Sequence, residues 1–142
     1  MKRKKVLRWA AAVCGVLLAG FTVLSSYVYN ALLPQVEVYS FLARDTLDVD
    51  DYSGEYWVPE GCIFSRDERN NVKLYRVEAR DGIFELEHYV VEIDGRILRE
   101  GEGKVEVDAP AMYMEEMLVS ASDKPLKSGD TVLVLNPEVL QE

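Results

Sequence analysis

A stretch without charged residues runs from Trp9 to Leu33, close to the start of the 142-residue chain. An α-helix rises ~1.5 Å per residue, so about 20 residues cross a hydrocarbon core of roughly 30 Å. The stretch is long enough to span a bilayer, and Pro34 directly after it favours the end of a helix. The pattern predicts a basic cytoplasmic tail at residues 1–8, a transmembrane anchor at 9–33 and one domain at 34–142.

Aromatic and basic residues flank this stretch in a manner typical of a membrane anchor. Trp9 lies near one end, and Tyr27 and Tyr29 lie near the other, where amphipathic rings favour the membrane–water interface. Basic flanks are retained on the cytoplasmic side of such helices. Five cations lie before the charge-free stretch: Lys2, Arg3, Lys4, Lys5 and Arg8. We therefore expect a single-pass protein of the cell membrane whose C-terminal domain is extracytoplasmic.

The alternative is a cleaved signal peptide, which also begins with a basic region and an apolar core. Such a core normally has ~7–15 residues and ends in a small-x-small cleavage site. Here Trp9 to Leu24 is already longer, and no Ala-x-Ala pattern follows it, although Ser25-Ser26 offers a weak site. The uncleaved anchor is the better interpretation, and cleavage stays as the alternative.

Small residues recur inside the predicted anchor at four-residue spacing, at Ala11, Gly15 and Ala19. This spacing lets two helix backbones approach closely, either in a homo-oligomer or against a helix of a partner. The simpler explanation is that alanine and glycine are common in membrane helices. Both interpretations stay open.

Charge is distributed unevenly along the chain. The net charge is −9, but five of the 16 basic residues and none of the 25 acidic residues precede residue 34, so residues 34–142 carry −14. Binding to nucleic acid phosphates needs a basic face, so this composition argues against nucleic acid as a partner. The acidic residues are interpreted as a solvated surface.

Alternating apolar and polar residues after Pro34 predict a mostly β domain. Turn signals at Asp81-Gly82, Asp94-Gly95 and 127–130 separate short runs rich in β-branched and aromatic residues. This spacing indicates a small antiparallel β-barrel or sandwich. Residues 111–117 are ambiguous between a loop and one helical turn. The predicted strands cover residues 35–42, 55–58, 72–78, 83–93, 97–98, 104–107, 117–120 and 131–135.

The run from Gln35 to Leu42 follows the anchor directly and raises the question of whether it is a stalk or a strand. An unpaired strand of this composition would expose a long apolar edge. The connector Ala43 to Gly54 is long enough, at up to about 40 Å, to return the chain to a neighbouring strand. We therefore expect residues 36–42 to pair within the sheet formed by residues 57–135.

No pattern in the sequence indicates an enzyme, a metal site or an organic cofactor. The acidic segment from Asp48 fails the calcium-loop pattern, because Pro59 stands at the twelfth position where glutamate is needed. His88 is the single histidine, and Cys62 has no cysteine partner in its own domain, because Cys14 lies in the anchor. A Cys62–His88 nucleophile pair lacks a glycine context for stabilising an oxyanion. Cys62 is expected to be a small buried apolar side chain.

Several segments of the domain resemble a known family. Val58-Pro59-Glu60-Gly61-Cys62-Ile63-Phe64 is similar to its V-P-x-x-A-[IVL] segment, and residues 72–77 are similar to a later strand. The most specific match is Met117–Ser120 followed by Asp123–Val132, with Lys124, Pro125, Leu126, Gly129 and Asp130 at the positions of "K-P-L-x-x-G-D". The family is the HlyD-like membrane fusion proteins, the periplasmic adaptor subunits of efflux and ABC exporters, and the likeness covers their membrane-proximal domain.

The chain departs from that family in the middle. Full adaptors insert a lipoyl domain, a helical hairpin and a β-barrel before the V-P segment, where this chain has only residues 43–54. The resemblance implies an anchored accessory protein that acts by docking to a transporter permease or another envelope protein. The alternative is an anchored ligand-binding or envelope assembly module unrelated to transport, and an anchored hydrolase ranks last.

Overall fold

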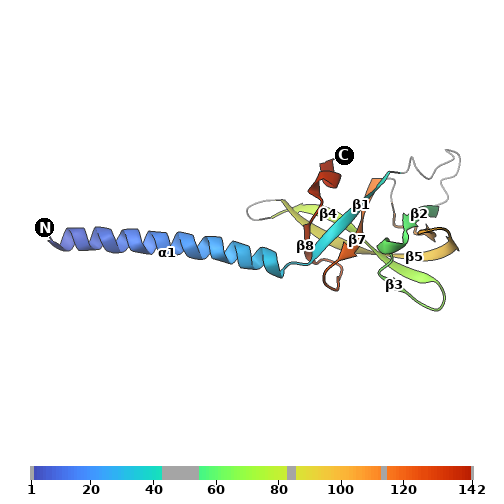
Figure 1. Ribbon diagram of the computed structural model, residues 1–142, viewed down its shortest axis with the longest axis horizontal. Helices are drawn as coiled ribbons and strands as arrows, with labels where there is room; N and C mark the ends of the chain where they lie inside the picture. Colours follow the sequence, from blue (N-terminus) through green and yellow to red (C-terminus); the bar gives the residue numbers. More distant parts are fainter. Residues whose placement is uncertain (1, 43–54, 83–85, 113–114, 142) are drawn as a thin grey trace. The chain divides into compact units, whose positions relative to one another are not determined.

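The computed structural model describes residues 2–42, 55–82, 86–112 and 115–141. It divides into two units, residues 1–33 and 34–142, shown together in Figure 1. The first unit is a single helix, α1 (Lys2–Leu32). Residues Lys4–Leu32 are long and apolar enough to cross a membrane, and their side chains are exposed within the protein, which supports membrane anchoring.

The second unit is a β domain, and it confirms the predicted fold class of an N-terminal helix followed by a mostly β barrel. Within the described residues, the short 3-10 helices η2 (Glu60–Cys62) and η3 (Pro137–Gln141) accompany its strands. Its strands are β1 (Gln35–Leu42), β2 (Glu55–Pro59), β3 (Ser65–Arg66), β4 (Asn71–Asp81), β5 (Leu86–Glu100), β6 (Lys104–Asp108), β7 (Glu115–Ser122) and β8 (Thr131–Val134).

Five strands close a barrel in the order β5-β8-β1-β7-β4, because β4 also pairs with β5. The remaining strands extend the sheet, with β3 beside β4, and with β6 and then β2 beside the second half of β5. The β1–β8 pairing is parallel, whereas the sequence predicted an antiparallel arrangement throughout. The reason is that β7 and β8 run in opposite directions on the two sides of β1, so only one of them can be antiparallel to it.

Two cores lie on the opposite faces of the long β4–β5 ribbon. The barrel interior takes one residue set from every barrel strand, and Tyr75 and Val90 are its members from β4 and β5. The flanking core covers the outer face of the same ribbon with β6, β2 and η2, and Leu74 and Ile93 are its members from β4 and β5. Strand alternation separates the two sets, because successive side chains point to opposite faces.

The expectation that residues 36–42 pair within the sheet is confirmed. In β1, Val36 lies opposite Ser122 of β7 and Val134 of β8, so the strand is hydrogen-bonded on both sides. Val36 and Val38 are buried in the barrel interior. The connector at 43–54 lies outside the described residues.

The predicted turn at Asp94-Gly95 is wrong, because β5 runs through both residues without interruption. The glycine serves close packing instead. A Cβ atom at Gly95 would lie 2.7 Å from Val107 Cγ1 and 3.2 Å from the Asp108 carbonyl oxygen on β6. A dipeptide typical of a turn thus marks the position at which two strands approach too closely for a side chain.

The remaining turn and loop predictions have mixed outcomes. The antiparallel β4–β5 hairpin is confirmed by the pairing of Asp81 with Leu86. The tight turn predicted at Asp81-Gly82 is wrong, because Asp81 is the last residue of β4 and is paired across the hairpin. Residues 83–85, predicted as the start of the returning strand, lie outside the described residues. The turn at 127–130 is confirmed, since Asp130 N donates to the Lys127 carbonyl at 3.0 Å. Of the ambiguous segment, residues 115–117 belong to β7, and 113–114 lie outside the described residues.

Candidate functional surface

The first polar surface is the rim of the barrel at which the chain arrives from α1. We call it the Gln35 rim and define it as Pro34, Gln35, Asp123, Lys124 and Leu133. Gln35 N donates to Asp123 Oδ1 at 2.7 Å, and Asp123 N donates to the Gln35 carbonyl at 3.1 Å. Leu133 N donates to the Pro34 carbonyl at 2.9 Å. The chain therefore becomes part of the barrel within two residues of the end of the helix at Leu32.

The loop that connects β7 to β8 passes the start of β1 and carries the motif positions Lys124, Pro125, Leu126, Gly129 and Asp130. A tight turn closes it, in which Lys127 N donates to Asp130 Oδ2 at 2.8 Å and Gly129 adopts φ +93°. Such a positive φ favours glycine, because L side chains clash there. The loop also joins β5, because Gly129 N donates to the Val90 carbonyl at 2.7 Å and Val90 N donates to the Asp130 carbonyl at 3.0 Å.

A buried tyrosine fastens the middle of this loop to the barrel. Tyr75 Oη lies 2.9 Å from the Leu126 carbonyl oxygen and 3.1 Å from Glu92 Oε2. Its single hydroxyl proton is shared by these two acceptors in a bifurcated hydrogen bond. Burial, together with the hydrogen bond to Glu92, raises the pKa of Tyr75. Lys73 donates to Glu92 Oε1 at 2.5 Å, and this bond holds the pKa of Glu92 below its usual range. The loop backbone is therefore fixed, while Pro125 and Lys127 are exposed on it.

The motif positions resembling the adaptor family fall in separate parts of the domain. Val58 is buried in the flanking core and Pro59 ends β2, whereas Leu126 is buried in the barrel interior. The structure therefore does not gather them into one site. Val58 and Leu126 pack in two different cores, and the exposed part of the β7–β8 loop is what a partner could contact.

A second polar surface lies on the outer face of the β4–β5 hairpin, and the sequence analysis did not identify it. Arg76 Nε lies 2.7 Å from Glu78 Oε1, and Tyr89 Oη donates to Glu78 Oε2 at 2.5 Å. Arg80 stacks over the Tyr89 ring at 5.0 Å and donates to Thr131 Oγ1 at 2.9 Å. The hydrogen bond from Tyr89, with the charge of Arg76, lowers the pKa of Glu78.

The signal that would have predicted this surface was present in the sequence. Arg76, Glu78 and Arg80 alternate along β4, and Tyr89 pairs with Glu78 in the hairpin register. Charges on one face of a paired strand interact across it with their register partners. Without the register, alternation alone did not show which cation would meet which anion.

The residues predicted at the membrane interface lie on α1. Trp9, Tyr27 and Tyr29 are exposed on the helix, and Trp9 is 18 and 20 residues from the two tyrosines. At ~1.5 Å per residue this separation is about 27–30 Å, close to the thickness of a hydrocarbon core.

The predicted small-residue positions Ala11, Gly15 and Ala19 are exposed on the same helix. A shallow apolar depression on α1 shares Ala19 with this set and is otherwise lined by Val16, Gly20, Val23, Leu24 and Tyr27. The depression follows from the missing side chain at Gly20, a position that the four-residue pattern did not include.

The groups considered for chemistry are not brought together. Cys62 is fully buried in the flanking core, and burial raises the pKa of its thiol to about 12. His88 lies two residues before Val90 on β5 and therefore shares its face, which is the barrel side and opposite to the flanking core that holds Cys62. Among the described residues, no group of three or more histidine, cysteine, aspartate or glutamate side chains could hold a metal ion.

Comparison with known proteins gives no match, whether to a family model, a curated protein or a solved structure. The class of protein is therefore stated from the structure alone. It is a β-barrel domain that follows an N-terminal helix long and apolar enough to anchor it in a membrane.

Proposed function

We propose that this protein is an extracytoplasmic accessory subunit that docks on an export or efflux transporter, with α1 holding it at the membrane. The resemblance of the β7–β8 loop to HlyD-like adaptors supplies the class of partner. The resemblance stops at the membrane-proximal domain, so the proposed role is docking to or stabilising the permease. It does not include forming a conduit across the periplasm.

The observation that carries this proposal is the short junction between helix and barrel. Only Leu33 and Pro34 separate α1 from β1, and the Gln35 rim binds the first residues of β1 on both sides. A domain tethered this closely meets other membrane proteins at high effective concentration, so a modest interface suffices for binding.

The proposed docking surface is the exposed part of the β7–β8 loop. Its backbone is held by Tyr75, Val90 and Gln35, so its conformation is set before a partner arrives. Preorganised loops bind at lower entropic cost than loops that order on contact. Lys127 is an exposed cation on this loop, whereas the carboxylates of Asp123 and Asp130 accept backbone hydrogen bonds within the protein. An acidic group on the partner would therefore pair with Lys127.

Orientation is tested first with reporters fused to residue 142. The five cations before and within the start of α1 favour a cytoplasmic N-terminus, so a reporter active only outside the cytoplasm should give signal there. Activity of a cytoplasmic reporter at the same position would reverse the orientation and remove the proposed function. A mature chain that begins near Ser26 would instead show that the anchor is cleaved.

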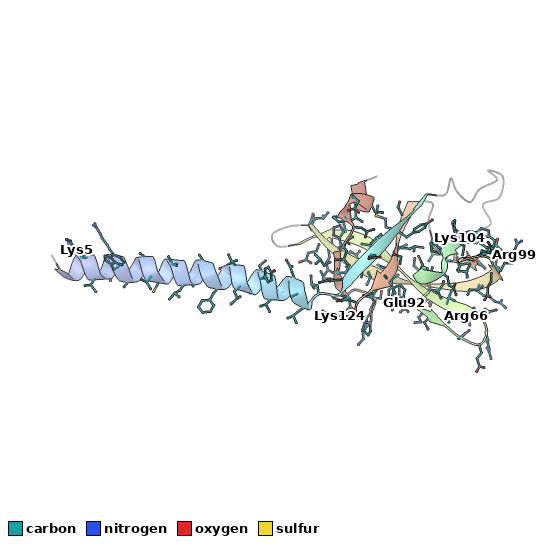
Figure 2. All side chains as sticks on the ribbon, viewed as in Figure 1. Lys5, Arg66, Glu92, Arg99, Lys104 and Lys124 are labelled. Atoms are coloured by element: carbon teal, nitrogen blue, oxygen red, sulfur yellow. The ribbon has the colours of Figure 1, made fainter. Side chains whose placement is uncertain are left out.

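Docking is tested by purifying the full chain from its native membrane in mild detergent and identifying bound proteins by mass spectrometry. We expect a transporter permease, and Lys127→Glu should reduce its recovery several-fold. Lys104→Glu makes the same charge change on β6, which Figure 2 shows well away from the labelled Lys124, and it should leave recovery unchanged. Recovery of envelope assembly proteins without a transporter component would favour the alternative module.

A further inference from the structure

Two large apolar side chains are exposed on the outer side of the barrel, beside the residues that connect it to α1. Leu133 is 36% exposed and Leu135 is 52% exposed. They alternate with Val132 and Val134, which face the barrel interior, so both leucines point outward. Leu133 N donates to the Pro34 carbonyl and Leu135 N donates to the Val36 carbonyl, both at 2.9 Å.

The covalent connection limits how far these leucines can be from the end of the helix. Leu133 pairs with Gln35, and neighbouring strands lie about 4.8 Å apart. Gln35 is three residues beyond Leu32, a distance of at most about 11 Å in a fully extended chain. The Leu133 backbone is therefore within about 16 Å of the helix end for any arrangement of the two units.

The same residues set the depth of the helix end. Tyr27 and Tyr29 favour the boundary of the hydrocarbon core, and Leu32 lies three to five residues beyond them, or about 5–8 Å along the helix. The headgroup region adds roughly 5–8 Å on each side of that core. The helix end thus falls within the headgroup region, and Leu133 is tethered to it.

We propose that the outer face of β8 rests on the lipid headgroup layer of the leaflet in which α1 ends, with Leu133 and Leu135 inserted among the headgroups. Asp123, whose carboxylate accepts a hydrogen bond from Gln35 N, and Glu37, two residues further along β1 than Gln35, are exposed near this face. These carboxylates oppose deeper insertion, so the two leucines stop in the headgroup layer.

The two leucines are hydrogen-bonded at different distances from the helix end, which predicts a gradient. Leu133 is bonded to Pro34, two residues beyond Leu32, whereas Leu135 is bonded to Val36, four residues beyond it. Leu133 should therefore be inserted more deeply than Leu135. This inference depends on the anchor and is independent of the proposed transporter partner.

The test uses the full chain in vesicles of phosphatidylcholine and phosphatidylglycerol, with an environment-sensitive fluorophore attached to a single reactive cysteine. Leu133→Cys, Leu135→Cys and Leu98→Cys are compared in a Cys14→Ala background, in which the buried Cys62 does not react. Leu98 is 42% exposed, and Figure 2 shows its neighbour Arg99 at the far end of the domain from Lys124. The natural Cys14, labelled in the unmodified chain, reports that the helix is inserted.

Quenching by lipids that carry a nitroxide in the headgroup region is the measurement. We expect it to be at least three-fold stronger at residue 133 than at residue 98, with residue 135 in between. Equal quenching at all three positions, while the Cys14 label is quenched by chain nitroxides, would overturn the proposal. Protection of residue 133 from aqueous iodide in native membranes, but not in vesicles that contain this protein alone, would also overturn it and assign the face to a protein partner.

Discussion

At the scale of single residues, two side-chain positions show how packing decides what a residue does. Gly95 lies where β5 passes β6 so closely that a Cβ atom would overlap Val107. Cys62 is fully buried on η2, where its thiol fills space in the flanking core. The role of Gly95 does not depend on the preference of glycine for turns, and the role of Cys62 does not depend on the reactivity of its thiol.

Gly95→Ala should destabilise the domain by about 1–3 kcal/mol, because the added methyl group forces the strands apart or strains Val107. Chemical denaturation of the full chain in detergent measures this loss. Asp94→Ala changes the exposed neighbour on the same strand and should shift stability by less than about 0.5 kcal/mol. Equal effects of the two substitutions would contradict the close-packing role of Gly95.

Cys62 should make the stability of the domain depend on pH in the alkaline range. Its pKa is about 12 in the folded chain against an ordinary value of 9.0, so the folded state keeps a proton that the unfolded state releases. The stabilising contribution is fully present below pH 9 and is lost as the pH rises from 9 towards 12. Between these two values the loss approaches about 1.4 kcal/mol per pH unit.

The matched comparison for this effect is Cys62→Ala, which keeps the other titrating groups. Denaturation at pH 8 and pH 10.5 should show a steeper decline for the natural chain than for the variant. Parallel declines would mean that the thiol ionises equally easily in both states.

At the scale of secondary-structure elements, β1 is the middle strand of the barrel, and it joins β7 to β8. It pairs with β7 and β8, but its ladder is irregular at a bulge between Glu37 and Val38. Asn136, just after β8, continues the ladder there. Its Oδ1 accepts from Val38 N at 2.9 Å, and its Nδ2 donates to the Val38 carbonyl at 2.7 Å.

Asn136→Ala should cost about 1–3 kcal/mol, because it leaves a backbone donor and acceptor without partners in a half-buried position. Asn136→Asp keeps an acceptor for Val38 N at any pH. Only its protonated carboxyl can also donate to the Val38 carbonyl, so the loss of stability should be smaller below the pKa of the new carboxyl than above it. Equilibrium unfolding measures both variants. A loss below about 0.5 kcal/mol for the alanine variant would show that water replaces the side chain.

Amide exchange should show β1 as a stable member of the barrel. Hydrogen-bonded amides buried in a sheet exchange only through opening reactions that approach global unfolding. We expect protection at residues 36–40 similar to that of residues 72–77 in β4, measured on the full chain by mass spectrometry. Rapid exchange in β1 beside slow exchange in β4 would mean that the strand detaches and that the domain is held on a flexible tether.

At the scale of the whole molecule, the two units differ in where their apolar side chains lie. The exposed apolar surface of α1 is compatible with lipid, whereas the β domain buries its own two cores. The domain carries a net charge of −14, yet most of the charges that the structure describes on the β4–β5 ribbon are paired with neighbours. Exposed pairs of this kind contribute little to stability, about 0–1 kcal/mol each, so the cores carry the fold.

Folding of the whole chain should not depend on a divalent metal. A thermal melt in detergent with a chelator, with added calcium or with neither should give the same midpoint within about 1 °C. A metal that binds only the folded state would raise the midpoint, so an unchanged value means that none binds. The acidic segment 44–51 lies outside the described residues, and the calcium arm tests it directly. An upward shift of several degrees with calcium would establish a site there.

The sequence by itself determined the features that depend on local composition. A charge-free run of this length already specifies a helix that can span a membrane, and alternation specifies strands. It also placed residues 35–42 in the sheet, since an apolar strand cannot stay unpaired. The turn at 127–130 was readable because Gly129 supplies the positive φ that the turn requires.

Only the tertiary structure decided which strands meet. Closure of the barrel through β4 and β5, the parallel β1–β8 pairing and the role of Gly95 all depend on contacts between residues far apart in the chain. The Arg76–Glu78–Tyr89–Arg80 surface and the outward leucines beside Pro34 are further consequences of register. The physical reason is that the strand period of two fixes which residues share a face, whereas the register that brings two faces together is set by the packing of the whole domain.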